Sequence, residues 1–285
     1  MARHLTVREA LRQAARCLAP RSGDEAHLEA ELLLCHVLGL DRARLYQHLP
    51  APLPAGVARR YDELLRRRLA GEPLAYMLGR REFFGLELEV GPAVLVPRPE
   101  TELLVELALS WLASHPAARW AMDVGTGCGA IALALAAYAP AGLGIVASDI
   151  SGEALALARR NALRLGLAGR LHLIQADLLG PVRGPLDLLV ANLPYVPTAE
   201  LAAAPPEVRR EPRIALDGGP DGLRVVARLL EQAPARMASG GLLLLEIAPD
   251  QAEAASALAR RAFPGARPSL HRDLSGAVRA LSLET

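Results

Sequence analysis

The most informative part of the sequence is Asp187-Leu-Leu-Val-Ala-Asn192-Leu193-Pro194-Tyr195-Val-Pro197. Residues 186–191 have the composition of a buried strand, and the Pro-Tyr pair that follows favours an extended turn. Ligands of open α/β sheets bind in the crevice beyond the carboxyl ends of the strands. An amide from Asn192 and a ring from Tyr195 at such an end would suit a planar nitrogen-containing substrate. Because Asn-x-Pro also ends many strands as an ordinary turn, the motif needs support from the rest of the chain.

Three earlier segments of strand type, at residues 120–124, 144–148 and 171–175, lead into glycine or acidic residues in the same way. The carboxyl ends of parallel strands meet at one edge of a sheet, so these residues are expected to lie near Asn192. The residues concerned are Gly125, Thr126, Gly127, Cys128 and Gly129 after the first strand, which contains Asp123, then Asp149 after the second, and Asp177 and Leu178 after the third. Four such endings in succession favour a ligand site over four unrelated turns.

The residue types at this edge indicate a nucleotide-like ligand. Glycines let the backbone approach a ligand closely and leave the start of the following helix open to polar groups. Asp149 has the spacing at which an acid reaches the ribose hydroxyls of a nucleotide. Gly125-x-Gly127-x-x-Ala130 also satisfies a dinucleotide fingerprint, so a nicotinamide oxidoreductase has to be considered. The chain has no Tyr-x-x-x-Lys arrangement for the proton relay of such an enzyme, and the set fits S-adenosylmethionine better.

Length and composition limit the class of protein. The 285 residues suit one large and one small domain, and with 52% hydrophobic but only 4% aromatic residues the core must be aliphatic. A net charge of +1 gives no global attraction to nucleic acid or acidic lipid. The three cysteines show no paired spacing, which fits a reducing cytoplasm and offers no metal site. The N-terminus lacks an apolar signal core, so we expect a soluble cytoplasmic protein.

Changes of hydrophobic period divide the chain into three parts. Residues 1–75 are predicted to form a small helical domain, in which Leu28, Leu32 and Val37 mark the buried face of the second helix. Residues 76–97 alternate with a period of two and are interpreted as a linking β-hairpin that turns at Gly91-Pro92. Residues 98–285 alternate strands and helices and end in two short strands. This order predicts a doubly wound α/β sheet with an antiparallel C-terminal edge. Residues 211–222 are predicted to form an irregular, turn-rich loop.

Several blocks of this sequence occur together in a known family of enzymes. They are Gly71-Glu-Pro-Leu-Ala-Tyr76, Gly79-x-x-Glu82-Phe83-Phe84-Gly85-Leu86, Pro97-Arg-Pro-Glu-Thr-Glu102, Asp123-Val-Gly-Thr-Gly-Cys-Gly-Ala130, the Asn192 motif, Glu211-Pro-Arg213 and Asp217-Gly-Gly-Pro-Asp-Gly222. With these blocks, the chain resembles the bacterial peptide chain release factor glutamine methyltransferases from about residue 5 to its C-terminus. The resemblance implies a Rossmann-like methyltransferase sheet and a helical N-terminal domain that helps to hold a protein substrate.

The activity implied by the resemblance is methyl transfer from S-adenosylmethionine to the side-chain amide nitrogen of the Gln in the Gly-Gly-Gln motif of class 1 release factors. Asn192 Oδ1 and the Leu193 carbonyl would accept the amide hydrogens, while Pro194 and Tyr195 would pack on the amide plane. Residues 125–129 would hold the methionine part of the cofactor, Asp149 the ribose, and Asp177 with Leu178 the adenine, with Asn192 bordering both ligands. We expect no metal, no direct nucleic-acid binding and no membrane partner.

One position departs from the family pattern. The family usually has Asn-Pro-Pro-Tyr, whereas this chain has Leu193 in place of the first proline. Leucine keeps the backbone carbonyl but loses the fixed φ of proline. The alternatives are a glutamine methyltransferase that acts on a ribosomal protein, a DNA amino-methyltransferase, and a non-catalytic partner protein that has kept its ligand pocket.

Overall fold

The computed structural model describes residues 5–285, which divide into two compact units. One unit contains the chain up to Gly79 together with Pro205–Arg210, and the other contains Arg80–Ala204 and Glu211–Thr285. Residues 1–4 of the predicted helical domain lie outside the described residues. A short segment of the second half of the chain is therefore part of the N-terminal unit.

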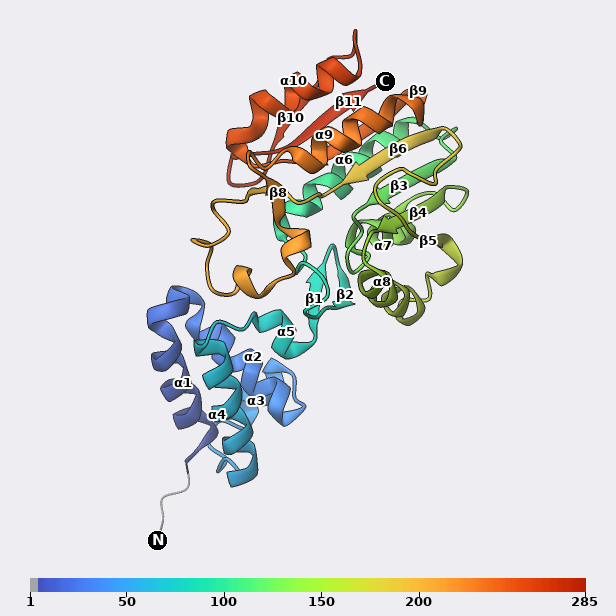
Figure 1. Ribbon diagram of the computed structural model, residues 1–285. Helices are drawn as coiled ribbons and strands as arrows, with labels where there is room; N and C mark the ends of the chain where they lie inside the picture. The colour runs from blue at the N-terminus through green and yellow to red at the C-terminus, as the bar shows by residue number, and fades with distance from the viewer. Residues whose placement is uncertain (1–4) are drawn as a thin grey trace. The chain divides into compact units, whose positions relative to one another are not determined.

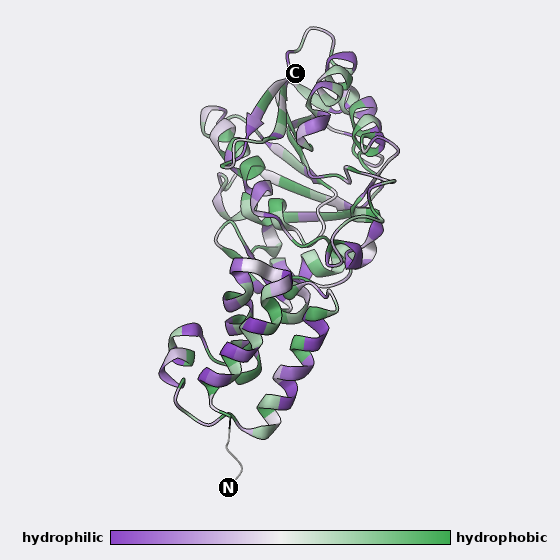
Figure 2. Cartoon of the chain, turned by 90° about the vertical axis from the view of Figure 1, so that its left-hand side faces the viewer, coloured by the Kyte–Doolittle hydropathy of each residue, from purple (hydrophilic) through white to green (hydrophobic). Residues whose placement is uncertain are grey.

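The N-terminal unit is helical, as predicted. Its helices are α1 (Val7–Ser22), α2 (Ala26–Leu38), α3 (Arg42–Gln47), α4 (Ala55–Leu69) and α5 (Leu74–Leu78). Thr6 and Glu9 form a capping box at the start of α1, and left-handed Gly39 ends α2. Figure 2 shows that hydrophilic and hydrophobic residues alternate along these helices, as expected of helices that bury one face.

The prediction of which face of α2 is buried was wrong. Leu28 is 41% exposed, whereas Leu33 and Leu34 are fully buried. Helix α2 packs against both α1 and α4, so its apolar surface is wider than a single stripe, and its periodicity did not identify the face correctly.

A buried ion cluster binds Pro205–Arg210 within this unit. Arg68 on α4 is 5% exposed and pairs with Glu29 on α2 and with Glu207, each at 2.6 Å. Gly71, with a φ of 92°, lies against Pro206, and an added Cβ would come within 2.8 Å of the proline side chain. Since a buried charge that loses its partner is strongly destabilising, the cluster holds this segment firmly.

The predicted β-hairpin is present, but its turn was placed wrongly. Strand β1 (Arg80–Phe83) pairs with β2 (Leu86–Glu89) around Phe84 and Gly85, so residues 86–89 belong to the second arm of the hairpin. Phe84 and Gly85 both have positive φ, at 50° and 74°, as in the type I′ turns that join tight hairpins. The backbone N–H of Phe84 donates to Glu102 and its ring packs edge-on against Tyr138. These contacts stabilise a conformation that is unusual for phenylalanine.

The second unit contains the predicted doubly wound sheet with an antiparallel edge. Its strands are β3 (Trp120–Val124), β4 (Gly144–Asp149), β5 (Leu171–Gln175), β6 (Leu186–Ala191), β9 (Met237–Glu246), β10 (Ser269–Arg272) and β11 (Val278–Glu284). The order across the sheet is β10-β11-β9-β6-β3-β4-β5; β11 is antiparallel to both of its neighbours, and the strands from β9 to β5 are parallel. Figure 2 shows that most of these strands are hydrophobic, as in sheets buried on both faces.

Helices cover both faces of this sheet (Figure 1). Helices α6 (Glu102–Ser114), α7 (Ala130–Tyr138) and α8 (Gly152–Arg164) lie on one face, and α9 (Arg224–Gln232) and α10 (Ala252–Ala262) lie on the other. Right-handed crossovers produce this division, because the chain moves outward in one direction from β3 and in the opposite direction from β6. The direction reverses between β3 and β6, which is where open α/β sheets form their ligand crevice.

The loop predicted to be irregular contains one regular element. Strand β8 (Asp217–Gly219) pairs in parallel with β7 (Val196–Pro197), directly after the Asn192 motif. Local composition did not predict this pairing, because the partner strand lies about 20 residues away and is rich in proline. The remainder of residues 211–222 forms turns and a short 3₁₀ helix, as expected.

Candidate functional site

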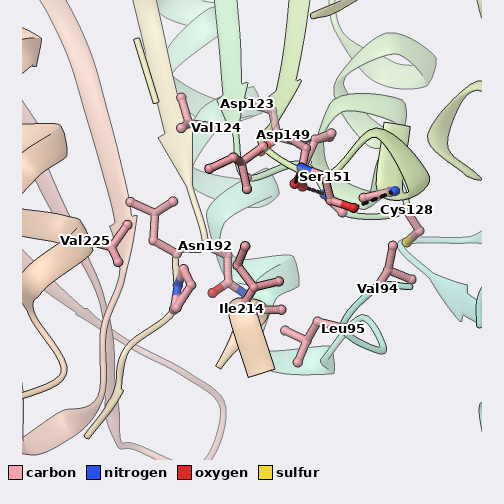
Figure 3. A pocket seen from close by; sticks show the side chains of 18 of the residues that line it. Val94, Leu95, Asp123, Val124, Cys128, Asp149, Ser151, Asn192, Ile214 and Val225 are labelled. Atoms are coloured by element: carbon pink, nitrogen blue, oxygen red, sulfur yellow. Dashed lines mark hydrogen bonds between the residues drawn. The ribbon is translucent and has the colours of Figure 1, made fainter. Parts of the chain in front are cut away.

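A cavity of about 610 Å³ lies at the carboxyl ends of β3, β4, β5 and β6. Figure 3 shows side chains from several segments converging on it, among them Asp123, Asp149 and Asn192. Of the residues selected from the sequence, those lining the cavity are Gly125, Thr126, Gly127, Cys128, Asp149, Asp177, Leu178, Asn192, Leu193 and Pro194. Gly129 and Tyr195 lie outside the lining. Strand ends far apart in the sequence therefore meet at one cavity.

The glycine loop between β3 and α7 has a backbone that few other residues could adopt. Gly125, Gly127 and Gly129 have φ values of 74°, 56° and 89°. An added Cβ on Gly125 would come within 3.1 Å of the Leu193 side chain, and one on Gly129 within 3.0 Å of Leu133 on α7. Gly125 thus allows close approach to the Asn192 motif, while Gly129 allows close packing beneath the site.

Asp123 lies under this loop and lines the cavity, at the edge of the sheet where the sequence placed it. Its Oδ2 accepts bonds from the Thr126 hydroxyl at 2.6 Å and from the Ala132 N–H at 3.1 Å. Its Oδ1 is buried and has no hydrogen-bond partner among residues 5–285. Burial raises the pKa of Asp123 to about 7, and the nearby charge of Asp149 acts in the same direction. A carboxyl group with an unused acceptor beside a cavity is suited to a cationic ligand.

Asp149 connects the glycine loop to the next strand. Its Oδ2 accepts from the N–H of Gly127 and its Oδ1 from the N–H of Ser151, both at 2.9 Å. Each carboxylate oxygen retains a further lone pair, so the group can accept two more hydrogen bonds from a ligand. Cys128 also borders the cavity, but burial raises the pKa of its thiol to about 12, which leaves it uncharged at neutral pH.

Asp177 and Leu178 form the far wall of the cavity. The Asp177 side chain is about half exposed and pairs with Arg228 at 2.7 Å. Leu178 is buried and has a φ of 56°, which is unusual for a residue other than glycine. The carboxylate of Asp177 is therefore already engaged, and the backbone around Leu178 is held in a special conformation beside the cavity.

Asn192 is held by a residue from the start of α6. Its Nδ2 donates to the Thr101 hydroxyl at 3.0 Å, and Thr101 itself is buried. Among the hydrogen bonds of residues 5–285, none is accepted by Asn192 Oδ1 or by the carbonyl oxygen of Leu193. The side chain of Leu193 is 4% exposed and packs in the core of the sheet. Two acceptors at the cavity edge are thus unused within the described part of the protein.

Tyr195 has a supporting position in this structure. Its hydroxyl donates to Glu246 Oε1, at the end of β9, at 3.1 Å, and burial raises its pKa. Its backbone carbonyl accepts a bond of 2.7 Å from Gln251. The predicted stacking of this ring on a substrate amide stays a prediction.

The glycine-rich block at residues 217–222 lies against the Asn192 motif, and an ion pair joins two further sequence blocks. An added Cβ on Gly218 would overlap the carbonyl of Pro194, and one on Gly222 would overlap the carbonyl of Tyr195. Arg98 pairs with buried Glu211 at 2.8 Å. The glycines of the 217–222 block therefore permit backbone contact with the motif, and the Arg98 pair joins residues 97–102 to residues 211–213.

Comparisons with known proteins give the family. Residues 9–79 match a family model described as the PrmC N-terminal domain, and residues 101–204 match the methyltransferase small domain. The release factor glutamine methyltransferase of Moorella thermoacetica is 48% identical over 90% of both chains, and that of Cereibacter sphaeroides is 43% identical over 96% of both. The chain belongs to the release factor glutamine methyltransferase family. The family resemblance inferred from the sequence blocks is confirmed.

Solved structures support the fold of the family's catalytic unit. A methyltransferase from Pyrococcus furiosus superposes with a TM-score of 0.52 and 18% identity, over 78% of this chain and 98% of that one. A 16S rRNA methyltransferase from T. thermophilus gives a TM-score of 0.53 at 18% identity, over 72% of this chain and 49% of that one. The Rossmann-like methyltransferase fold is thus confirmed. Within the described residues, no cluster of His, Cys, Asp or Glu is arranged to hold a metal ion, and no helix is long and apolar enough to span a membrane.

Proposed function

We propose that this protein transfers a methyl group from S-adenosylmethionine to the side-chain amide nitrogen of the Gln in the Gly-Gly-Gln motif of class 1 release factors. The observation that carries the proposal is the pair of unused acceptors, Asn192 Oδ1 and the Leu193 carbonyl, beside a cavity of nucleoside size. A primary amide has two N–H groups on one nitrogen, and two neighbouring acceptors can receive both.

The residues around the cavity fit S-adenosylmethionine. The cofactor is a cation, and Asp123 offers a buried carboxyl oxygen without a partner beside the cavity. Asp149 would bind the ribose hydroxyls with its remaining lone pairs, while its backbone contacts keep it oriented toward the cavity. Gly125 to Cys128 would lie against the methionine part, and Leu178 with Asp177 against the adenine. The bound cofactor would supply an electrophilic methyl group on its sulfonium sulfur.

The protein's main contribution to the reaction would be to position the amide. The nitrogen of an amide is a poor nucleophile because its lone pair is delocalised into the carbonyl. Asn192 Oδ1 and the Leu193 carbonyl would accept both hydrogens, orient the lone pair and stabilise positive charge as it develops on nitrogen. Orientation of this kind contributes up to about 7–11 kcal/mol in favourable cases. Pro194, which lines the cavity, would pack on the amide plane with Tyr195 behind it, and the proton would leave to water.

The relatives and the charge of the chain favour a release factor over the alternatives. The sequence relatives at 41–48% identity are named for release factors, and they align along most of this chain. The formal net charge of +1 offers little attraction to a DNA duplex, which counts against a DNA amino-methyltransferase. The unused acceptors next to the cavity count against a non-catalytic role. A release factor substrate would place the activity in the cytoplasm.

The helical unit would bind the body of the protein substrate. Among its described residues, no group of His, Cys, Asp or Glu is arranged to hold a metal ion, and remote binding energy can be used to hold a reacting group in place. Removal of residues 1–71 should slow methylation of a full-length release factor far more than methylation of a short Gly-Gly-Gln peptide. Because truncation also removes Arg68 and Arg21, the partners of Glu207, folding of the truncated protein has to be checked by circular dichroism. An equal loss on both substrates would assign the unit a purely structural role.

The activity itself is tested with labelled S-adenosylmethionine. Purified protein would be incubated with each class 1 release factor of the same organism, and the modified residue identified by mass spectrometry. A release factor whose Gly-Gly-Gln glutamine is replaced by Ala is the matched control substrate. We expect one methyl group on that glutamine and none on the control. Label on a ribosomal protein or on DNA in a cell extract, with none on release factors, would reject the proposal.

A further inference from the structure

The wall of the cavity contains an exposed apolar side chain, that of Ile214. It is 58% exposed and lines the cavity together with Asn192, Leu193 and Pro194. Single exposed apolar residues are common on protein surfaces, but this one belongs to the cavity that holds the two unused acceptors. Its side chain lies in the same part of the cavity as those of Asn192 and Leu95 (Figure 3). A substrate that enters there would meet Ile214.

The turn that carries Ile214 is tied to the Asn192 motif. This turn is the short 3₁₀ helix Arg213–Ala215. The carbonyl of Leu216, directly after it, accepts a bond of 2.9 Å from the N–H of Val196. Val196 follows Asn192 by only a few residues in the sequence. Ile214 is therefore held on the side of the cavity where the substrate amide would bind.

Both the backbone and the side chain of Ile214 are restrained. Just before the turn, buried Glu211 accepts two bonds from Arg98 Nη2, at 2.8 and 2.9 Å. Pro212 has a φ of −62°, which its ring fixes. The side chain of Ile214 is β-branched and has few χ1 rotamers. The isoleucine is thus a wall that yields little when a ligand presses on it.

The length of a glutamine side chain brings the substrate backbone close to this wall. An extended glutamine side chain places its amide nitrogen about 5 Å from its own Cα. With that nitrogen at Asn192 Oδ1 and the Leu193 carbonyl, the backbone of the target residue has to enter the mouth of the cavity. The Cα of the preceding residue follows at about 3.8 Å. A glycine at that position presents only hydrogen atoms to the wall, whereas any other residue presents a Cβ.

Resting on the proposed function, we infer that Ile214 is a specificity-determining residue that excludes a side chain from the residue directly before the target glutamine. Its side chain fills the space beside the substrate backbone, so that a preceding glycine fits and a preceding alanine does not. A glutamine in an ordinary sequence meets this wall before its amide reaches Asn192 Oδ1 and the Leu193 carbonyl. The selection is steric and needs no hydrogen bond to the glycine.

Two substrates that differ by one methyl group test this role. They are a full-length release factor and its variant in which the second glycine of Gly-Gly-Gln is replaced by alanine. The wild-type protein should prefer the first by at least about ten-fold in kcat/KM, as for one surplus methylene in a restricted site. Ile214→Ala shortens the wall to its Cβ, so it should reduce this preference at least about five-fold, mainly by raising kcat/KM on the alanine variant. Ile214→Val, which is branched but shorter, should give an intermediate preference.

A structural role of Ile214 would not produce this substrate-dependent change. Calorimetry should find the cofactor dissociation constant of Ile214→Ala within about two-fold of that of the wild-type protein. Its thermal midpoint should be unchanged, because a half-exposed side chain contributes little to the core. Leu163→Ala is the matched control, since Leu163 on α8 is 62% exposed and lies outside the lining of the cavity. This variant should keep the wild-type preference.

Three outcomes would overturn the inference. They are equal methylation of both substrates by the wild-type protein, an unchanged preference in Ile214→Ala, and an equal change of preference in Leu163→Ala. An unchanged preference in Ile214→Ala would assign the selection to the backbone conformation of the substrate itself. A wild-type protein that methylates the Gly-Gly-Gln glutamine without this preference overturns the inference alone. One that methylates no release factor overturns the proposed function, and the inference with it.

Discussion

Asp149→Ala is expected to weaken S-adenosylmethionine binding by roughly two to four powers of ten. Both carboxylate oxygens of Asp149 already accept backbone N–H groups of Gly127 and Ser151, and each retains one lone pair for a ribose hydroxyl. A hydrogen bond to a charged group contributes about 1.5–3 kcal/mol, so the loss of two corresponds to about 3–6 kcal/mol. At about 1.4 kcal/mol per tenfold change, this gives the stated range. Alanine also frees the Gly127 N–H, which can then donate to the ligand and offset part of the loss. We therefore expect a loss of affinity near the lower end of this range.

Isothermal titration calorimetry would measure this affinity, and circular dichroism would show that the variant is folded. Asp177→Asn is the matched control, because Asp177 borders the same cavity from the next strand. Its side chain is about half exposed and already paired with Arg228, so its contribution should be no more than about 1 kcal/mol. Unchanged affinity in Asp149→Ala, or an equal loss in both variants, would refute the assignment of Asp149 to the ribose.

Asn192→Ala should reduce the single-turnover rate by about 10²–10³, as for the loss of one preorganised group that stabilises developing charge. Calorimetry should find the cofactor affinity within a few-fold of that of the wild-type protein, and a near wild-type rate would reject the positioning mechanism. Leu193→Pro should keep or slightly raise turnover because the carbonyl is retained. Its thermal midpoint should fall by a few degrees, because a 4% exposed core side chain becomes smaller, and a large loss of turnover would show that the side chain has its own role. Cofactor affinity should rise up to about ten-fold from about pH 6 to about pH 8, because the Asp123 carboxyl, with a pKa of about 7, must ionise to attract a cation. The raised pKa also affects stability: protonated Asp123 stabilises the folded state, and this contribution is lost as the pH rises from 3.8 to about 7. Asp123→Asn should abolish both pH effects. Equal pH profiles in the two proteins would exclude Asp123 as the source of these effects.

The sequence was sufficient to predict which strands end at the site. Apolar runs that stop at a glycine, an acid or an amide identify the ends of buried parallel strands, and these ends must share one edge of the sheet. Glu246 follows its apolar strand in the same way, so the signal that identified Asn192 could also have identified Glu246. It was overlooked because a lone acid after a leucine run matches no binding motif.

Other parts of the site could not be predicted from local patterns. Thr101 meets Asn192 across a separation of 91 residues, and no local pattern indicates that its hydroxyl accepts from Asn192 Nδ2. The turn at Phe84 needs a positive φ that phenylalanine rarely adopts, and contacts with the distant helices α6 and α7 stabilise it. Residues 205–210 were included in the predicted methyltransferase domain because Arg68, the buried partner of Glu207, lies in the first quarter of the chain.

Long-range contacts also explain why the Asn192 motif can use leucine at its second position. A proline at position 193 would fix the backbone angle φ of that residue through its own ring. In this protein, the motif is held from outside: Gln251 binds the Tyr195 carbonyl, and the glycines of residues 217–222 lie directly against the carbonyls of Pro194 and Tyr195. Leu193 adds a buried side chain that packs against Gly125 and so joins the motif to the glycine loop. Restraint by packing can therefore replace restraint by the proline ring, and the position of the Leu193 carbonyl depends on the surrounding fold rather than on the residue itself.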